Sequence, residues 1–267
     1  MKPYVAVGLP RRSKPTSILL YGHKVHSSKG VCTIEPVANV SSLLNHSFNN
    51  ILSCVINNYE DGMPLTHLAF LHDDIDAEAG WVDVLWQEME AVGADFISAY
   101  VPIKDDRALT SMAQYENDPW DFDRFTLRQL ATMPDTFTQD DVPWNLYLNT
   151  GCCLLKLREP WVSQPDKFTF HTKEKISRGK DGKWIASVIS EDWLFTDAIR
   201  KAGGRLAATR KVRLSHQGEH DYRNDTIWGR WHRDEAYASR HGEGNEESQI
   251  PSGRDLQAER TGAVTAV

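Results

Sequence analysis

The 267-residue sequence predicts an α/β fold with a mostly parallel central sheet flanked by helices and a small antiparallel addition. Three observations lead to this prediction. Strand-like and helix-like patterns alternate through the first hundred residues, the strand at 67–71 is apolar along its length, and Gly93 and Gly203 follow helical runs. A continuously apolar strand is typical of the centre of a parallel sheet, where helices cover both faces.

The elements are predicted in order from the apolar spacing. The first strands and helices are expected at 4–8, 31–35, 43–56, 67–71, 81–92 and 94–101. The first two strands are expected to stop at Pro10 and Pro36, because proline cannot donate to a sheet ladder. Residues 104–144 have no apolar period and are predicted to be a substrate loop or lid. The later elements are one or two strands in 146–157, a mobile loop at 173–183, a helix at 190–202 and a basic strand at 205–214.

Length and composition indicate one domain at 1–222, a C-terminal helix or lid at 223–240 and a disordered polar tail at 241–267. A net charge of −7 argues against nucleic-acid binding through bulk charge. The four cysteines are expected to be reduced thiols. The longest charge-free run, 36–59, contains six asparagines, so we expect no transmembrane segment and a cytoplasmic location.

The sequence His72-Asp73-Asp74-Ile75-Asp76 directly follows the apolar strand. In open α/β sheets, ligands bind at the carboxyl ends of the strands. Three carboxylates there repel one another unless a cation lies between them. Mg²⁺ or Mn²⁺ is the expected occupant, because one or two carboxylates and substrate phosphates hold such ions. The alternative is a solvated acidic turn that caps the following helix.

Two further motifs carry possible chemistry. Glu191-Asp192 opens a helix after Ser190, where acids suit the helix dipole, and either carboxylate is also placed to act as a general base. His216 ends a basic strand and is either a structural residue or a metal ligand.

The order of these motifs resembles that of the GT-A nucleotide-sugar glycosyltransferases, particularly their family 2-like members. Leu71-His-Asp-Asp74 followed by Trp81 matches the spacing of the family's Asp-rich motif and its tryptophan. The segment from Asn149 to Leu155 resembles the acceptor-side strand, and Glu191-Asp192 resembles the Glu-Asp pair that opens a helix. His216 resembles the family's late metal-ligand histidine. The resemblance covers residues 3–222.

The resemblance implies a single GT-A type, Rossmann-like domain that transfers a sugar from a nucleoside diphosphate-sugar to an acceptor hydroxyl. It implies that Mn²⁺ or Mg²⁺ is held by Asp74, Asp76 and His216. The implied donor contacts are His72, Asp73, Asp74, Asn50, Pro10 and Arg12. The acceptor contacts are Asn149 and Gly151, with Trp144 available to stack on a sugar. Inversion requires Asp192, or Glu191, to take the acceptor proton, and the sequence leaves retention open.

Several alternatives stay open at this point. The Asp-x-Asp register is either His72–Asp74 or Asp74–Asp76. The same acidic cluster also suits a metal-dependent phosphoester hydrolase. Because a histidine stands at the family's first Asp position, a non-catalytic nucleotide-sugar-binding protein is the other alternative. The acceptor is open among a glycan, a protein, a lipid-linked precursor, a small molecule and a modified nucleic acid.

Overall fold

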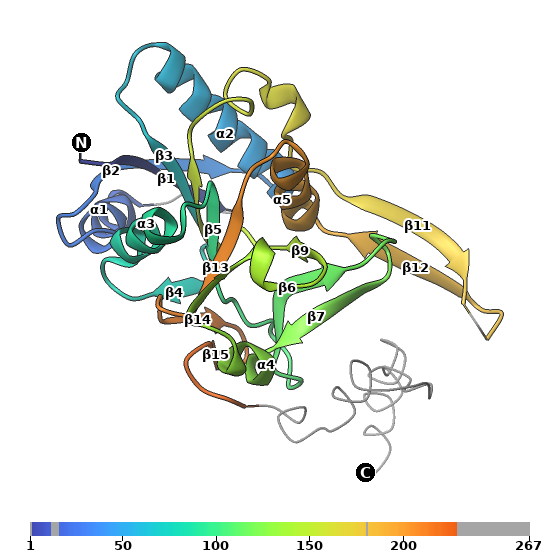
Figure 1. Ribbon diagram of the computed structural model, residues 1–267. Coiled ribbons are helices and arrows are strands. Elements are labelled where there is room, and N and C mark those ends of the chain that lie inside the picture. The colour runs from blue at the N-terminus through green and yellow to red at the C-terminus, as the bar shows by residue number, and fades with distance from the viewer. Residues whose placement is uncertain (1, 12–15, 180, 229–267) are drawn as a thin grey trace, which may run out of the picture.

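A computed structural model describes residues 2–11, 16–179 and 181–228. Its centre is a seven-stranded sheet in the order β2-β1-β3-β10-β5-β13-β8 (Figure 1). These strands are β1 (Tyr4–Arg11), β2 (Thr33–Val40), β3 (His67–Leu71), β5 (Phe96–Ala99), β8 (Thr136–Thr138), β10 (Cys152–Lys156) and β13 (Leu206–Thr209). β10 and β8 run antiparallel to their neighbours, and the other five are parallel to one another. The predicted α/β class and mostly parallel sheet are confirmed.

Helices cover both faces of this sheet (Figure 1). On one face lie α1 (Ser17–His26) and α3 (Trp81–Val92), and on the other lie α2 (Leu44–Glu60) and α5 (Glu191–Lys201). Between α2 and α5, the ring of Phe170 stacks on Phe48 at 4.5 Å and on Phe195 at 4.1 Å. Burying each such ring contributes about 1.5–3 kcal/mol. This packing fixes the helices that carry polar residues at the sheet's carboxyl edge.

Two predicted strand ends and one helix differ in the structure. β1 continues one residue past Pro10, to Arg11. β2 continues through Pro36 to Val40, because it is an edge strand where a missing amide donor is tolerated. The sequence does not predict α1, whose apolar residues Ile18 and Tyr21 are exposed instead of forming a buried stripe.

The stretch at 104–144 is not an irregular lid. It folds into β6 (Leu109–Tyr115), β7 (Phe122–Thr126), α4 (Leu127–Thr132), β8 and the short 3₁₀ helix η1 (Gln139–Asp141). β6 lies between β7 and β9 (Asn145–Tyr147) in a three-stranded antiparallel sheet. This sheet packs against α5, and so it helps to position the helix that begins with Glu191.

The predicted mobile loop at 173–183 is part of a β-hairpin formed by β11 (Lys173–Arg178) and β12 (Trp184–Ile189), which follows the 3₁₀ helix η2 (Pro165–Lys167). The predicted basic strand at 205–214 is β13 and the start of β14 (Leu214–Gln217). β14 pairs with β4 (Ile75–Ala77) and β15 (Asp221–Arg223). None of the described helices is long and apolar enough to cross a membrane.

Close packing with the body of the protein continues just after residue 222. Asn224 is buried, and its side chain accepts a hydrogen bond from the Leu214 amide and donates to the carbonyl of Tyr100. Of the predicted C-terminal helix or lid at 223–240, residues 223–228 are described and none is helical. The rest of that segment and the tail at 241–267 lie outside the described residues.

Candidate active site

The carboxyl end of β3 meets the start of β10 in a close backbone contact. The His72 amide donates to the carbonyl of Gly151 over 2.9 Å. A Cβ atom at Gly151 would lie 2.8 Å from Cδ1 of Ile75, so a larger residue here would require the Ile75 side chain to shift. Asn149 is 1% exposed, and its side chain accepts from the Gly151 amide and donates to the Ala99 carbonyl. Asn149 and Gly151 therefore shape the turn, and the structure does not present the Asn149 side chain to an acceptor.

Asp74 lies at the tip of the turn between β3 and β4. Its Oδ2 atom is 2.5 Å from Lys104 Nζ and 3.4 Å from His216 Nε2. Burial of this carboxylate raises its pKa, but the contacts with His216 and Lys104 outweigh burial and hold the pKa well below its usual range. Asp74 is therefore ionised, and Lys104 is the positive charge beside it.

His216 is oriented by a backbone contact behind it. β14 pairs with β4 so that His216 lies opposite Ile75, one residue from Asp74. Its Nδ1 atom is 2.7 Å from the carbonyl oxygen of Pro102. Because a carbonyl only accepts, Nδ1 carries the proton of that bond, and Nε2 is directed toward Asp74. A backbone carbonyl that accepts from one ring nitrogen typically orients an imidazole whose other nitrogen binds a metal.

Two buried polar atoms at this tip, Oδ1 of Asp74 and Nε2 of His72, have no hydrogen-bond partner among the described residues. A buried polar atom without a partner is costly, and a bound ion or ligand atom is one explanation for it. One carboxylate and one imidazole suit Mn²⁺ or Mg²⁺ when substrate phosphates supply other ligands. The donor set at Asp74 and His216 therefore fits such an ion.

The other acidic residues of the motif lie apart from this pair. Asp76 is exposed on β4, and among the described residues no three His, Cys, Asp or Glu side chains are grouped to hold an ion. The predicted three-ligand set of Asp74, Asp76 and His216 is thus not assembled. Asp73 is also exposed, and its Oδ2 is 3.7 Å from Nε of Arg11.

The two predicted carboxylates of the other motif lie in the first turn of α5. Thr150 Oγ1 donates to Asp192 Oδ1 over 2.5 Å. Burial raises the pKa of Asp192, opposed by Thr150 and by the charge of Arg124. Burial and the Asp192 charge raise the pKa of Glu191, while His72 opposes this shift. A carboxylate with a raised pKa is a better proton acceptor than an ordinary one.

His72 connects the two halves of the site. Burial is the main cause that lowers the pKa of its imidazole. The charge of His216 lowers this pKa further, and the charges of Asp74 and Glu191 raise it. The contacts Asp74–His216, His72–Gly151 and Thr150–Asp192 bring the tip of β3, the end of β14 and the start of α5 to one edge of the sheet, although about 140 residues separate β3 from β14.

Sequence reasoning missed Lys104 and Arg124, which lie in the stretch interpreted as a lid. The Arg124 guanidinium lies 4.6 Å above the ring of Trp193 and donates to the Thr110 carbonyl. Thr150, which bonds to Asp192, lies within the turn from Asn149 to Gly151. The polar residues of this turn could have indicated from the sequence that it lies at the site. Arg11 was also missed. The resemblance implied its neighbour Arg12 instead, which is outside the described residues.

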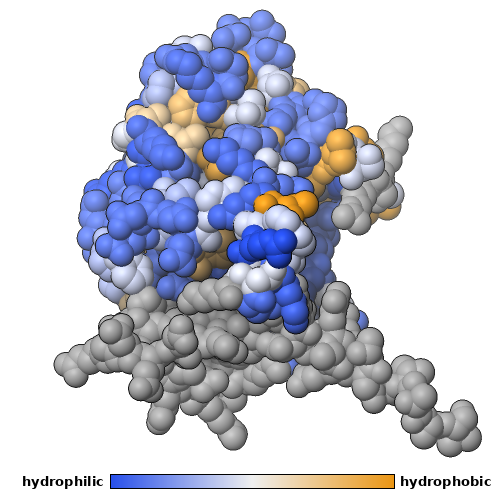
Figure 2. Space-filling view, turned by 90° about the vertical axis from the view of Figure 1, so that its right-hand side faces the viewer, coloured by the Kyte–Doolittle hydropathy of each residue, from blue (hydrophilic) through white to orange (hydrophobic). Residues whose placement is uncertain are grey.

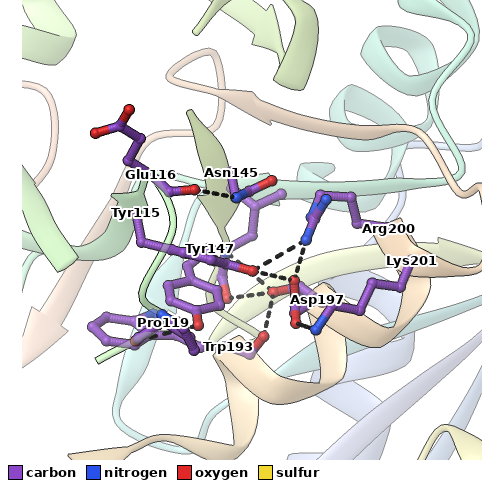
Figure 3. Close-up of polar contacts among 11 residues, drawn as sticks. Tyr115, Glu116, Pro119, Asn145, Tyr147, Trp193, Asp197, Arg200 and Lys201 are labelled. Carbon is purple, nitrogen blue, oxygen red and sulfur yellow. Dashed lines mark hydrogen bonds and ion pairs between the residues drawn. The ribbon is translucent and has the colours of Figure 1, made fainter. Parts of the chain in front are cut away.

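The α5 helix is anchored by a cluster around Asp197 (Figure 3). The hydroxyl of Tyr115 donates to Asp197 over 2.9 Å, and Arg200 and Lys201 each form an ion pair with it at 2.6 Å. Burial raises the pKa of this carboxyl, but the bonds from Lys201, Arg200 and Tyr115 outweigh burial and lower it. Losing one partner of such a buried pair typically costs about 3–5 kcal/mol. The cluster therefore fixes the helix whose first turn carries Asp192.

The predicted donor residues Pro10 and Asn50 lie near each other at the carboxyl ends of β1 and β2. Pro10 pairs with Asn39, and the amide of Asn50 donates to Asn39 Oδ1 over 3.4 Å. This edge of the sheet is continuous with the tip that carries Asp73, through the contact between Asp73 and Arg11.

Trp144, which the sequence suggests for stacking on an acceptor sugar, lines a polar cavity of about 560 Å³ with Glu116, Asn145 and Arg200. Arg200 lies on α5, the helix that begins with Glu191 and Asp192. Stacking of Trp144 on an acceptor stays a prediction.

The fold and site together define a mixed α/β protein with a polar, cation-suited site at the carboxyl edge of a mostly parallel sheet. No protein-family model matches the chain, and neither does any curated protein. Solved structures do match it. One, titled "Crystal Structure of A197 from STIV", is 13% identical, with 94% of this chain and 98% of that chain covered and a TM-score of 0.46. A likeness at this level assigns no activity.

Proposed function

We propose that this protein is a metal-dependent glycosyltransferase with a GT-A type domain. In this proposal it moves a sugar from a nucleoside diphosphate-sugar to an acceptor hydroxyl. One observation carries the proposal: a pair suited to a divalent cation, Asp74 and His216, lies at the same sheet edge as the carboxylate of Asp192, which accepts a hydrogen bond from Thr150 beside the contact between Gly151 and His72. Glycosyl transfer needs these two elements, one for the leaving diphosphate and one for the acceptor proton.

Asp74 and His216 would hold the ion, and diphosphate oxygens would complete its coordination. Bound Mn²⁺ or Mg²⁺ supplies Lewis-acid stabilisation of the negative charge on the departing diphosphate. Lys104 lies against Asp74 and Arg11 lies near Asp73, so both cations are close enough to contact phosphate oxygens at this edge. Pro10 and Asn50 would lie toward the nucleoside.

Asp192 would act as the general base. The hydrogen bond from Thr150 orients the carboxylate, which would take the proton of the acceptor hydroxyl. A base on the side of the sugar opposite the leaving group gives inversion at the anomeric carbon. Thr150 and the charge of Arg124 oppose the rise of the Asp192 pKa that burial causes.

Isothermal titration with UDP, GDP and dTDP, each with and without Mn²⁺, tests the proposal. We expect at least one nucleotide to bind, and its affinity to rise when Mn²⁺ is added, because the ion joins the protein and the diphosphate. A phosphoester hydrolase that uses the same acidic residues requires no nucleotide. Failure of all three to bind in a Mn²⁺-dependent way would contradict glycosyl transfer.

A second measurement distinguishes the proposed enzyme from a non-catalytic nucleotide-sugar-binding protein. The wild type is expected to release nucleoside diphosphate slowly from its donor by transfer to water, and a folded Asp74→Ala variant is expected to lose this activity. Binding of the donor without any turnover would favour the non-catalytic alternative.

A further inference from the structure

The β11–β12 hairpin projects from the body of the protein (Figure 1). The two strands pair so that Ile176 lies opposite Ala186, and Arg178 lies opposite Trp184. Directly opposed residues of an antiparallel pair point to the same face. One face of the hairpin therefore carries the alternate residues Glu174, Ile176, Arg178, Trp184, Ala186 and Val188.

This face is exposed and largely apolar. Ile176 is 74% exposed, Trp184 is 61% exposed and Val188 is 51% exposed. The opposite face is partly covered by the body, since the ammonium of Lys175 lies 4.4 Å from the ring centroid of Trp120 and Ile189 is buried. Exposed apolar residues grouped on one face mark an interaction surface.

The hairpin as a whole is basic, although Lys173 and Lys175 lie on the opposite face and the apolar face carries Arg178 together with Glu174. Between positions 173 and 189 the sequence has five Lys or Arg residues and two Asp or Glu residues, although the whole chain has a net charge of −7. The Arg178 guanidinium lies 4.4 Å from the ring centroid of Trp184. Figure 2 views the side toward which the hairpin projects, and hydrophobic and strongly hydrophilic residues lie next to each other there.

We propose that this face of the β11–β12 hairpin docks on an anionic lipid surface. Tryptophan and aliphatic side chains enter the interfacial region of a bilayer, and neighbouring Lys and Arg side chains bind anionic headgroups. A second copy of the chain fits less well, because a symmetric contact would bring the two basic hairpins together. A nucleic acid fits less well, because Ile176 and Val188 offer nothing to phosphates or bases.

The hairpin leads directly into the candidate active site. β12 ends at Ile189, and Glu191 and Asp192 begin the next element, α5 (Figure 1). A hairpin bound to a membrane would thus hold Asp192 close to its surface. This step rests on the proposed function and assigns the acceptor to the class of lipid-anchored hydroxyl compounds.

Co-sedimentation of the full chain with vesicles tests the docking surface. We expect binding to phosphatidylcholine vesicles that contain phosphatidylglycerol, weakening with added salt, and much weaker binding to pure phosphatidylcholine. The double variant Ile176→Ser/Trp184→Ser is expected to bind anionic vesicles about tenfold or more weakly. The matched control Ile18→Ser/Tyr21→Ser changes residues on α1 that are 82% and 71% exposed, and it is expected to bind like the wild type.

Equal losses in the hairpin and α1 variants would overturn the proposal, as would a wild type that does not bind anionic vesicles. A hairpin-dependent dimer, or hairpin-dependent binding of a single-stranded RNA oligonucleotide in place of vesicles, would also overturn it. If circular dichroism shows that the apolar variant is unfolded, Lys173→Glu/Lys183→Glu provides the test, with weaker binding to anionic vesicles expected. Vesicle binding without Mn²⁺-dependent nucleotide binding would support the docking surface and contradict the proposed function.

Discussion

Replacing Asp192 with Asn is expected to slow sugar transfer by about 10²–10⁴-fold, the range typical for loss of a general base. The substitution keeps the size of the side chain and the hydrogen bond from Thr150, but it removes the group that accepts the proton. Nucleotide binding in the presence of Mn²⁺ is expected to stay close to that of the wild type, because the base is needed only for chemistry. Release of nucleoside diphosphate from the donor measures the first effect, and calorimetry measures the second.

Glu191→Gln is the matched control, since this carboxyl is adjacent on the first turn of α5 and also has a raised pKa. We expect a much smaller loss of rate in this variant. Equal loss of nucleotide binding and of turnover in Asp192→Asn would instead assign Asp192 a structural or donor-binding role. A larger loss in Glu191→Gln would move the base to Glu191.

The pH dependence of kcat follows from the same carboxylate. Asp192 must be ionised to accept a proton, and burial raises its pKa above the ordinary aspartate value. The rate should therefore fall as the pH is lowered through this raised pKa. Glu191→Gln removes a neighbouring negative charge, which favours the ionised form of Asp192, so the acid limb should move to lower pH.

Asp74→Ala has the second large expected effect, a loss of nucleotide affinity by about tenfold or more in the presence of Mn²⁺, together with a loss of turnover. The variant removes the carboxylate from the pair suited to the ion. Without Mn²⁺ the affinity should not fall, because Lys104 loses its partner at 2.5 Å and becomes available to the diphosphate. The difference between the two titrations separates loss of an ion ligand from general damage to the site.

Asp76→Ala is the control for Asp74→Ala, and it also decides the motif register. Asp76 is exposed on β4 and is not grouped with Asp74 and His216. Nucleotide binding in Asp76→Ala should therefore match that of the wild type. Equal losses in the two variants would favour the Asp74–Asp76 register over His72–Asp74.

The parts of the site that the sequence predicts are those set by local patterns. An apolar strand before His72 and a helix start at Glu191 are visible in the spacing of a few residues, and both elements are present in the structure. The topology of an α/β sheet then brings their ends together. The same local signals predicted α3 and its end at Gly93, which has a φ of 66°.

The missed parts depend on contacts between distant segments. Lys104 and Arg124 reach the site because β6, β7 and β9 pack beside α5, and nothing local in the aperiodic stretch at 104–144 signals this arrangement. The Asp76 prediction was drawn from spacing alone, whereas strand alternation in β4 gives it a different environment from Ile75 and Ala77. Residues 173–183, which form most of the β11–β12 hairpin's first half, are predicted to be a loop because lysines and glycines obscure the strand alternation, and the apolar face of the hairpin does not enter the core.

The central claim of the proposed function is that a cation bridges the turn after β3 and the diphosphate of the donor. The direct measurement is anomalous scattering at the manganese edge from crystals soaked with Mn²⁺ and a nucleoside diphosphate. We predict one strong peak within coordination distance of a carboxylate oxygen of Asp74 and Nε2 of His216, with phosphate oxygens on its other side. A diphosphate bound at this edge with no manganese near Asp74, or a manganese ion held elsewhere, would contradict the account.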